Sequence, residues 1–320
     1  LCYQCQKCSS GCPVAEHFDL APNQLMRAIQ LGQKEMVLHS KTIWLCAMCE
    51  TCATRCPHEI NITKIMDALK IMAQKEGIEP KVPSVSFFYH AALRGIQWFG
   101  RIYEAGLMAE LYLRQMLSGQ LDVNQVWNQD MPLALKMLKA GKLKIIPSVG
   151  KPRLKGRVSE RKDGIAYFPG CSLHGTSKEY HLSTQAIFQK MGIPLHEPDG
   201  WGCCGTTPAH STDHYLSTLL PMKNIALIQE EGFHYVTTPC PSCFLRMRVA
   251  VKETRETQEL SEKITRDIPH LSLNEIKIDH LLNTLVEKVG FDRIASLVVK
   301  PLKGLRVVCY YGCIITRPPK

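Results

Sequence analysis

The sequence predicts an α+β multidomain protein, with an all-helical N-terminal head followed by an α/β domain and the start of a repeat of that domain. Two observations favour this organisation. Apolar residues recur with helical spacing in the first part of the chain, whereas short apolar runs that end in glycine or proline turns follow residue 164. The 320 residues are enough for two or three domains with cores of their own.

Three helical stretches are expected in the N-terminal part. Apolar residues fall on one helical face between residues 25 and 37 and again between 62 and 72. Asn61 is a suitable N-cap for the second of these helices, and Gly77 is a stop signal. The third stretch, 84–117, is rich in aromatic residues, which we interpret as core or as an interface with another protein chain.

Eight cysteines near the N-terminus form two copies of the pattern C-x-x-C-x-x-C-x-x-x-C-P, offset by 44 residues. Such runs bind two [4Fe–4S] clusters, and the cysteine before the proline ligates the cluster of the other run. Zinc and structural disulfides are the alternatives, but zinc sites pair their ligands across a gap. We therefore expect two crossed ligand sets, which are Cys2, Cys5, Cys8 and Cys56 for one cluster, and Cys46, Cys49, Cys52 and Cys12 for the other.

Five further cysteines lie at three expected loop tips of the α/β domain: Cys171, Cys203, Cys204, Cys240 and Cys243. Loops at the carboxyl edge of a parallel sheet meet at one place, where such folds bind ligands. Two adjacent cysteines and three more do not suit one tetrahedral zinc, and five thiolates exceed the four that a cubane needs. One iron–sulfur cluster is therefore expected here, and buried structural cysteines are the alternative.

The end of the chain repeats the opening of the α/β domain. The residues from Tyr310 to Cys313 resemble those from Tyr167 to Cys171, each after an apolar run. We expect a second strand over 304–310, with Cys309 as a small core residue, and Cys313 as the first ligand of a second five-cysteine site. The chain is then a fragment that stops soon after the repeat begins.

Composition and charge exclude some functions. Fifteen cysteines gathered in ligand runs favour a reducing, cytoplasmic compartment over a secreted disulfide scaffold. The sequence contains no uncharged apolar run of about 18 residues, so no membrane-spanning helix is predicted. No nucleic-acid motif and no G-x-G-x-x-G fingerprint for a flavin is present. Of the net charge of +10, residues 136–162 carry nine, through ten basic residues and one acid, so this segment is either a solvated linker or a docking arm for an acidic partner.

The spacing from Cys171 to Cys243 resembles the CCG domain of the catalytic subunit of heterodisulfide reductase, and the N-terminal 140 or so residues resemble the dicluster iron–sulfur subunit of that enzyme. The resemblance implies a fusion of these two subunits, with an all-helical ferredoxin-like head, an α/β CCG domain and the truncated start of a second one. The expected divisions are a head with two clusters at 1–78, a helical arm and basic linker at 79–163, the first CCG domain at 164–260, and a connector with the second repeat at 261–320.

In that family, the catalytic subunit holds a noncubane [4Fe–4S] cluster in each of two CCG motifs and reduces the disulfide CoM-S-S-CoB. Electrons arrive through the dicluster subunit from a flavin-containing subunit. The resemblance thus implies an oxidoreductase of anaerobic metabolism such as methanogenesis, acting on a sulfur group, with two cubanes and one or two noncubane clusters. Its partners would be a flavoprotein like that third subunit and a hydrogenase or formate dehydrogenase. The catalytic cysteines would be Cys171, Cys203, Cys204, Cys240 and Cys243.

Two other interpretations stay open. CCG domains also occur in proteins that pass electrons to or from quinones, so the chain is alternatively an electron conduit, and a scaffold with structural metal is the third option. Protons for disulfide reduction would come from water or from a histidine near the cysteines. His174 follows Cys171 and His210 follows Cys204, although each is also readily explained as a surface residue.

Overall fold

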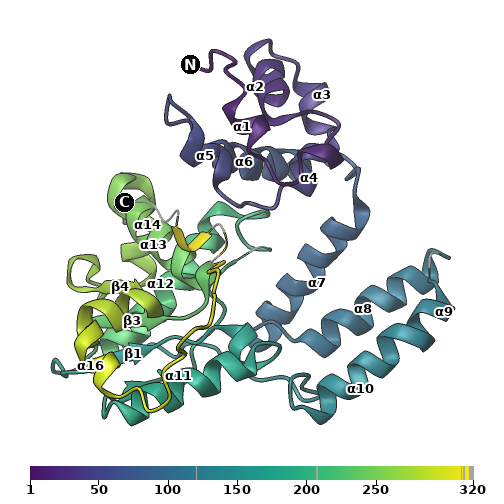
Figure 1. Cartoon of the computed structure of the whole chain (residues 1–320). Helices are drawn as coiled ribbons and strands as arrows, with labels where there is room; N and C mark the ends of the chain where they lie inside the picture. Colours follow the sequence, from purple (N-terminus) through teal and green to yellow (C-terminus); the bar gives the residue numbers. More distant parts are fainter. Residues whose placement is uncertain (120, 207, 311, 313, 317–320) are drawn as a thin grey trace.

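The computed structural model describes residues 1–119, 121–206, 208–310, 312 and 314–316. In Figure 1 the head, a helical arm and the α/β domain follow one another along the chain, and the head lies beside the α/β domain. None of the helices in these described ranges combines the length and the apolar character that a membrane crossing needs.

The head consists of short helices and contains no strand in residues 1–78, all of which are described. Leu25, Ile43 and Met66 are fully buried at its centre. The predicted N-cap is confirmed, because the Asn61 side chain accepts a hydrogen bond from the backbone N–H of Lys64. The helices are α1 (Lys7–Ser10), η1 (Ala15–His17), α2 (Pro22–Gln30), α3 (Lys34–Leu38), α4 (Lys41–Leu45), α5 (Thr51–Arg55) and α6 (Ile62–Lys75).

The arm leaves the head through α7 (Pro83–Phe99), and Gly100 ends this helix in the left-handed conformation at φ 74°. The chain continues as α8 (Glu104–Leu117), α9 (Val123–Gln125), η2 (Val126–Asp130, a π-helix) and α10 (Met131–Lys139). No residue of α8, α9, η2 or α10 is buried. The aromatic Trp98 is 64% exposed, so the expected packing of the aromatic residues holds for Tyr89 but not for Trp98 within this chain.

The α/β domain is built on one parallel sheet in the order β2-β1-β3-β4. Alternating strand residues face opposite sides: Ala166 and Val236 pack with α12, α13 and α14, whereas Ile165 and Tyr235 pack with α11 and α15. Helices therefore cover both faces. The elements are β1 (Ile165–Tyr167), η3 (Cys171–His174), α11 (Lys178–Lys190), β2 (Leu195–His196), α12 (His214–Glu230), β3 (Tyr235–Thr238), α13 (Pro241–Glu256), α14 (Gln258–Asp267), η4 (Leu273–Glu275), β4 (Lys277–His280), α15 (Leu281–Thr284), η5 (Leu285–Val289, also a π-helix), α16 (Phe291–Ser296) and η6 (Ile314–Thr316).

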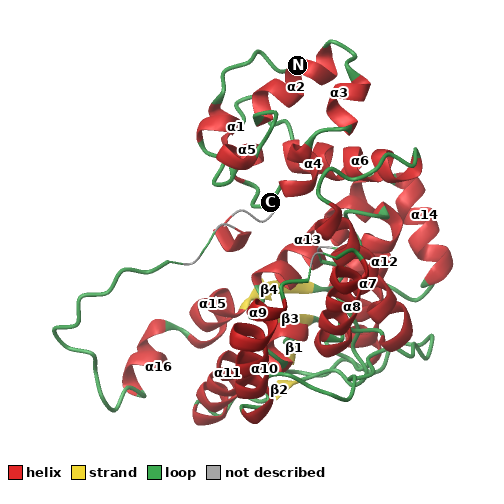
Figure 2. Cartoon of the chain, turned by 90° about the vertical axis from the view of Figure 1, so that its right-hand side faces the viewer, coloured by secondary structure: helices red, strands yellow, loops and turns green. Residues whose placement is uncertain are grey.

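The prediction of a strand over residues 304–310 is wrong. Residues 304–310 form no strand, and Val308 and Tyr310 are about fully exposed, at 95% and 90%. In Figure 2 this segment runs as a loop away from the sheet. Cys309 is likewise exposed and not a core residue. A parallel strand needs a neighbour for its backbone hydrogen bonds, and no described segment pairs with this one. Cys313, the expected first ligand of a second site, lies outside the described residues.

The later part of the basic segment lies along the α/β domain. The Gly150 N–H donates to the Phe99 carbonyl (2.8 Å), and the backbone N–H groups of Lys155 and Gly156 both donate to the Glu230 carboxylate (2.7 Å each). The backbone of this segment is therefore held by the fold and is not a free linker. A role for its charge in docking stays a prediction.

Candidate iron–sulfur sites

The carboxyl ends of β1, β2 and β3 meet at one edge of the sheet and bring together five cysteines that lie far apart in the sequence. Cys171 opens η3 directly after β1, and Cys203 and Cys204 follow β2. Cys240 is the N-cap of α13, which places Cys243 in its first turn. The arrangement follows from the parallel sheet, whose loops after the strands all emerge on the same side.

The five thiols lie close enough together to shift one another's pKa. Cys203 contacts Cys171 and Cys204, Cys204 also contacts Cys243, and Cys243 contacts Cys240. Cys203, Cys204 and Cys243 are buried, whereas Cys171 and Cys240 are partly exposed. The structure thus brings together the whole set that the sequence singled out, while the role of these residues as ligands stays a prediction.

Interactions among the five thiols shift their pKa values in opposite directions. Thiol hydrogen bonds to Cys171 and Cys204 raise the pKa of Cys203, and those to Cys204 and Cys240 raise the pKa of Cys243, with burial adding in both cases. Interactions with Cys203 and Cys243 instead lower the pKa of Cys204 well below its usual range. A hydrogen bond from Cys243 lowers the pKa of Cys240 to about 7. Thiolates are the form that binds metal, so the site favours ionisation at two positions before any metal enters.

Two backbone features hold the cysteine loops in place. Gly170 has φ 77°, and a Cβ there would lie 2.7 Å from the Cys243 sulfur, so only glycine fits. The fully buried Asn224 of α12 supports the paired cysteines: its side-chain oxygen accepts from the Gly202 N–H (2.7 Å) and its amide donates to the Cys203 carbonyl (3.1 Å). A buried amide whose polar atoms are all paired fixes the loop against which it packs.

The arm closes the site on the side of Cys171. The Arg101 guanidinium lies 3.5 Å from the centre of the Trp201 ring and donates to the Trp201 carbonyl (2.8 Å). A small cavity of about 20 Å³ lies here, enough for about one water molecule. It is lined by Arg101, Ile102, Tyr103, Glu104, Lys144, Ser148, Cys171, His174 and Trp201.

His174 belongs to a polar network beside this cavity. Its Nε2 lies 3.1 Å from a Glu197 oxygen that also accepts from the Trp201 indole N–H (2.6 Å). Burial raises the pKa of Glu197, but these two hydrogen bonds outweigh it, so the pKa is lowered. His181 stands 5.1 Å from the His174 ring, and burial lowers its pKa. The network holds the His174 ring at the wall of a cavity that Cys171 shares.

The two cysteine runs of the head repeat each other in backbone conformation. Gln4 and Gln6 in the first run have positive φ (65° and 62°), and so have their counterparts Met48 and Glu50 in the second (52° and 61°), again 44 residues on. Left-handed non-glycine residues are uncommon. Their recurrence between successive cysteines shows that both runs curl in the same way, as loops do that wrap their thiols around one centre.

The two runs lie close to each other. Burial and, after it, the charge of Cys49 in the second run raise the pKa of Cys12 in the first. A hydrogen bond with Cys5, burial and the charges of Cys56 and Cys2 raise the pKa of Tyr3. Crossed ligation itself stays a prediction. Burial raises the pKa of Cys46 to about 11 and that of Cys52 to about 12. A centre of net positive charge is needed to keep these partly buried thiols ionised, as iron would do.

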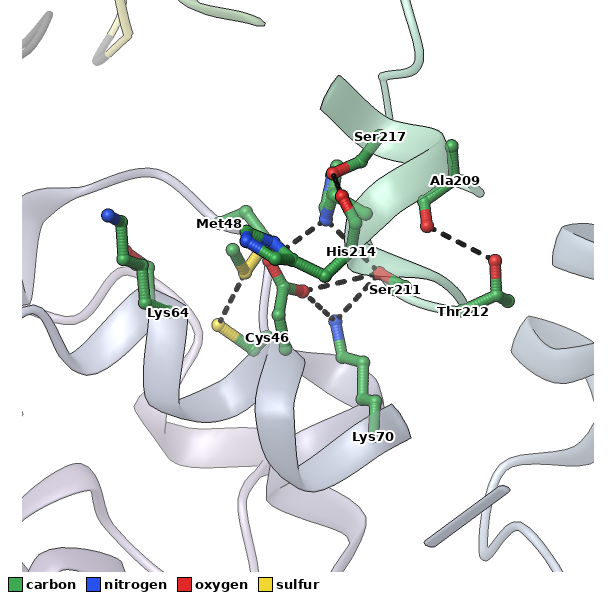
Figure 3. A network of polar contacts seen from close by, with 12 residues as sticks. Cys46, Met48, Lys64, Lys70, Ala209, Ser211, Thr212, His214 and Ser217 are labelled. Carbon is green, nitrogen blue, oxygen red and sulfur yellow. Dashed lines mark hydrogen bonds and ion pairs between the residues drawn. The ribbon is translucent and has the colours of Figure 1, made fainter. Parts of the chain in front are cut away.

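The head and the α/β domain meet at a polar junction, shown in Figure 3. His210 lies 3.0 Å from an Asp67 oxygen of α6, so the histidine faces the head and not the five cysteines. The Lys70 ammonium, fully buried, lies 3.4 Å from the Ser211 hydroxyl, and the Gln74 amide donates to the Ser211 carbonyl (2.7 Å). One cavity at this junction, of about 410 Å³, is lined by both Cys46 and His210.

The described thiols are not gathered as closely as one zinc ion would require. Four thiolates around one zinc lie about 3.8 Å apart, given Zn–S bonds of about 2.3 Å. Across the described chain, the one group of three or more ligand-type side chains whose donor atoms all lie within 4.8 Å of one another is His174, His181 and Glu197. No described trio of cysteines is gathered that tightly, so no three of the described thiols are placed for a single zinc ion.

Several residues that support these sites were not predicted from the sequence. Lys70 had a recognisable signal, because it lies on the apolar face of α6 beside the buried Met66 and Leu69, where a lysine is unusual. Arg101 and Glu197 had none, since their partners come from other segments.

Comparison with known families covers both cysteine-rich parts. Residues 1–61 match the 4Fe-4S dicluster domain, and residues 165–248 match the cysteine-rich CCG domain. The chain joins a dicluster domain to a CCG domain. The head is thus an iron–sulfur domain, and the predicted fusion of a segment like the dicluster subunit of heterodisulfide reductase with a CCG domain is confirmed.

Curated relatives match parts of the chain. It is 32% identical over 159 residues (49% of the chain, 54% of the relative) to the 8-methylmenaquinol:fumarate reductase membrane anchor subunit of Wolinella succinogenes. It is 35% identical over 80 residues (25% and 42%) to an iron-sulfur subunit of the CoB–CoM heterodisulfide reductase of Methanopyrus kandleri. It is 36% identical over 87 residues (27% and 34%) to one subunit of the ferredoxin:CoB-CoM heterodisulfide reductase of Methanosarcina acetivorans. The chain spans about a third to a half of the length of these relatives.

Proposed function

We propose that the chain is an iron–sulfur electron-transfer protein whose five-cysteine site reduces a disulfide such as CoM-S-S-CoB. The observation that carries the proposal is the chain of five linked thiols beside a cavity that Cys171 shares with His174. The likeness to heterodisulfide reductase subunits supports it. When bound, two cubanes in the head would supply one-electron relays, and a noncubane cluster in the CCG domain would supply iron for the substrate sulfurs.

The residues of this chain have distinct parts in the proposal. The two crossed cysteine sets of the head hold the relays, and the CCG cysteines hold the terminal centre. Breaking the disulfide takes two electrons and two protons and gives two thiols. His174 is better placed than His210 to hand over a proton, because it lines the cavity with Cys171, whereas His210 is paired with Asp67 at the junction.

The partners follow from the same likeness. We propose a flavoprotein, like the flavin-containing subunit of heterodisulfide reductase, as electron donor, with a hydrogenase or formate dehydrogenase behind it, in the cytoplasm. The relative from Methanococcus maripaludis, one subunit of an H(2)/formate:CoB-CoM heterodisulfide,ferredoxin reductase, supports this arrangement.

One observation favours a second candidate, a conduit to or from a quinone. The relative that aligns over 49% of the chain is an anchor subunit of a methylmenaquinol:fumarate reductase, and that alignment is longer than those to the heterodisulfide reductase subunits reported above. In that case the CCG centre would pass electrons on and would bind no disulfide.

The two candidates are separated by a direct acceptor test. The cluster-loaded protein is reduced anaerobically and mixed either with CoM-S-S-CoB or with a water-soluble menaquinone analogue. Release of two thiols per disulfide, with a changed EPR spectrum of the CCG centre, is the expected result. Quinol formation without thiol release would favour the conduit. Zinc at the five-cysteine site in metal analysis would leave only a structural scaffold.

A further inference from the structure

Lys70 is the most deeply buried charged side chain of the head, with no exposed surface. It comes from α6 and reaches the junction with the CCG domain, where its ammonium lies 3.4 Å from the Ser211 hydroxyl and 3.7 Å from an Asp67 oxygen. The ring of Tyr89 lies 5.8 Å away. Burying an ammonium group with a single carboxylate partner costs desolvation free energy, so packing alone does not account for a lysine at this position.

Lys70 lies near the second cysteine run. Helix α4 ends at Leu45, directly before Cys46, and Cys46 packs against the same buried cluster of the head as Met66 of α6. Tyr89, whose ring lies 5.8 Å from the Lys70 ammonium, lines one cavity together with Cys46. Figure 3 shows Lys70, Ser211 and Cys46 at the same junction. Lys70 therefore lies close both to a predicted ligand of one head cluster and to the Ser211 loop of the CCG domain.

The internal repeat of the head supplies a natural comparison. The offset of 44 residues that relates the two cysteine runs places Met26 where the second run has Lys70, each 14 residues after the last cysteine of its run. Both lie on helices that follow their runs, and both are buried. The two halves thus differ at this position by one positive charge, and the charged half is the one that faces the CCG domain.

We propose that Lys70 sets the reduction potential of the head cluster on the Cys46 side above that of the cluster on the Cys2 side, so that electrons in the head collect next to the CCG domain. A nearby positive charge stabilises the reduced, more negative state of a cluster, and charge and burial are among the factors that set such potentials. In this scheme Lys70 does not ligate the cluster. It is a positioning residue, whose charge acts on the cluster that Cys46 is predicted to ligate. The inference needs the two head clusters but not the identity of the final acceptor.

Redox titration of the full, cluster-loaded chain, followed by EPR, tests the proposal. In Lys70→Met, which copies the first half of the repeat, the potential of the Cys46-side cluster is expected to fall. A tenfold change in its ratio of reduced to oxidised form corresponds to about 59 mV. The Cys2-side cluster is expected to stay unchanged, and the two potentials converge. Lys75→Met, on an exposed position of the same helix, is the matched control and leaves both potentials unchanged.

A second variant separates charge from packing. Asp67→Asn removes the negative charge beside Lys70 and is expected to raise the same potential, opposite to Lys70→Met. Lys70→Gln, which keeps a donor for Ser211, is expected to lower the potential and serves if the methionine variant does not fold. Unchanged potentials in Lys70→Gln or Lys70→Met, or shifts of the same sign in the lysine and aspartate variants, would overturn the proposal. Thiol release from a disulfide does not enter this measurement, so its outcome is independent of the proposed reaction.

Discussion

The head and the CCG domain gather their cysteines in opposite ways. The head carries its eight cysteines in two short runs, and only Cys8 of them is buried. The CCG domain takes five from three loops after three strands, and buries Cys203, Cys204 and Cys243. A site built from one run depends on local backbone conformation, whereas a site built from three loops depends on the whole sheet. The two sites should therefore respond differently to the same kind of change.

The largest difference is expected for the loss of one thiol at the centre of the CCG site. Cys204→Ser interrupts the chain between Cys203 and Cys243, so the cluster of this site should be lost or altered and disulfide reduction should fall sharply, while both head clusters remain. Iron analysis and EPR check this. Cys309→Ser is the control, because Cys309 is exposed and belongs to neither site. Full iron content and full activity in Cys204→Ser would contradict the assignment.

Crossed ligation in the head is tested with pairs of substitutions. Cys12 and Cys49 are expected to serve one cluster, so Cys12→Ser with Cys49→Ser should remove about four irons per chain. Cys12→Ser with Cys5→Ser should remove one ligand from each cluster, so that about eight irons per chain are lost. The two pairs would give the reverse order of iron loss if Cys12 ligated the cluster of its own run.

A methyl group at Gly170 is expected to damage the CCG site alone. Gly170→Ala puts a Cβ at 2.7 Å from the Cys243 sulfur and in a left-handed conformation, so iron should be lost at that site only. Gly192→Ala is the matched control, since Gly192 has a similar φ of 67° but open space around it, and should cost only about 1 kcal/mol of unfolding free energy. Equal iron loss in both variants would mean that strain, not contact with Cys243, is responsible.

The smallest effect concerns pH. Burial lowers the pKa of His280, whose ring nitrogen lies 3.0 Å from the Pro239 carbonyl at the start of the Cys240 loop. Below about pH 6.5, His280 takes up a proton in the unfolded chain but stays neutral in the folded protein, because its folded-state pKa is lower. The free energy of unfolding should therefore decrease as the pH falls, until the folded-state pKa is reached. Thermal unfolding at several pH values measures this. His280→Gln should flatten that dependence, and an unchanged slope would exclude His280 as its source.

The sequence predicted the head more fully than the rest because the head is local. The run spacing, the Asn61 cap and the periodic face of α6 all lie within short segments. The five CCG cysteines were also identified, since glycine and proline mark the ends of their strands. The gathering of these five thiols, the support from Asn224 and the contact of Arg101 with Trp201 depend on segments that only tertiary packing brings together.

The wrong prediction of a strand over residues 304–310 also reflects a dependence on distant segments. Residues 304–310 have the composition of a strand but no neighbour with which to pair among the described residues, and propensity alone does not form a strand. Likewise β4, which lies beyond the expected domain limit at residue 260, completes the sheet beside β3. Its place was not visible from its own residues.

The arm has a consequence for the dynamics of the chain. Helices α8 and α10 have no buried residue, whereas α12 has eleven. Local opening therefore costs little in the arm, and its amide hydrogens should exchange with solvent long before those of α12, which open only when the domain unfolds. Neither set of cysteine loops includes α8–α10, but Glu104 of α8 lines the cavity beside Cys171. Opening of the first turn of α8 would therefore expose that cavity to solvent before the cysteine loops themselves change.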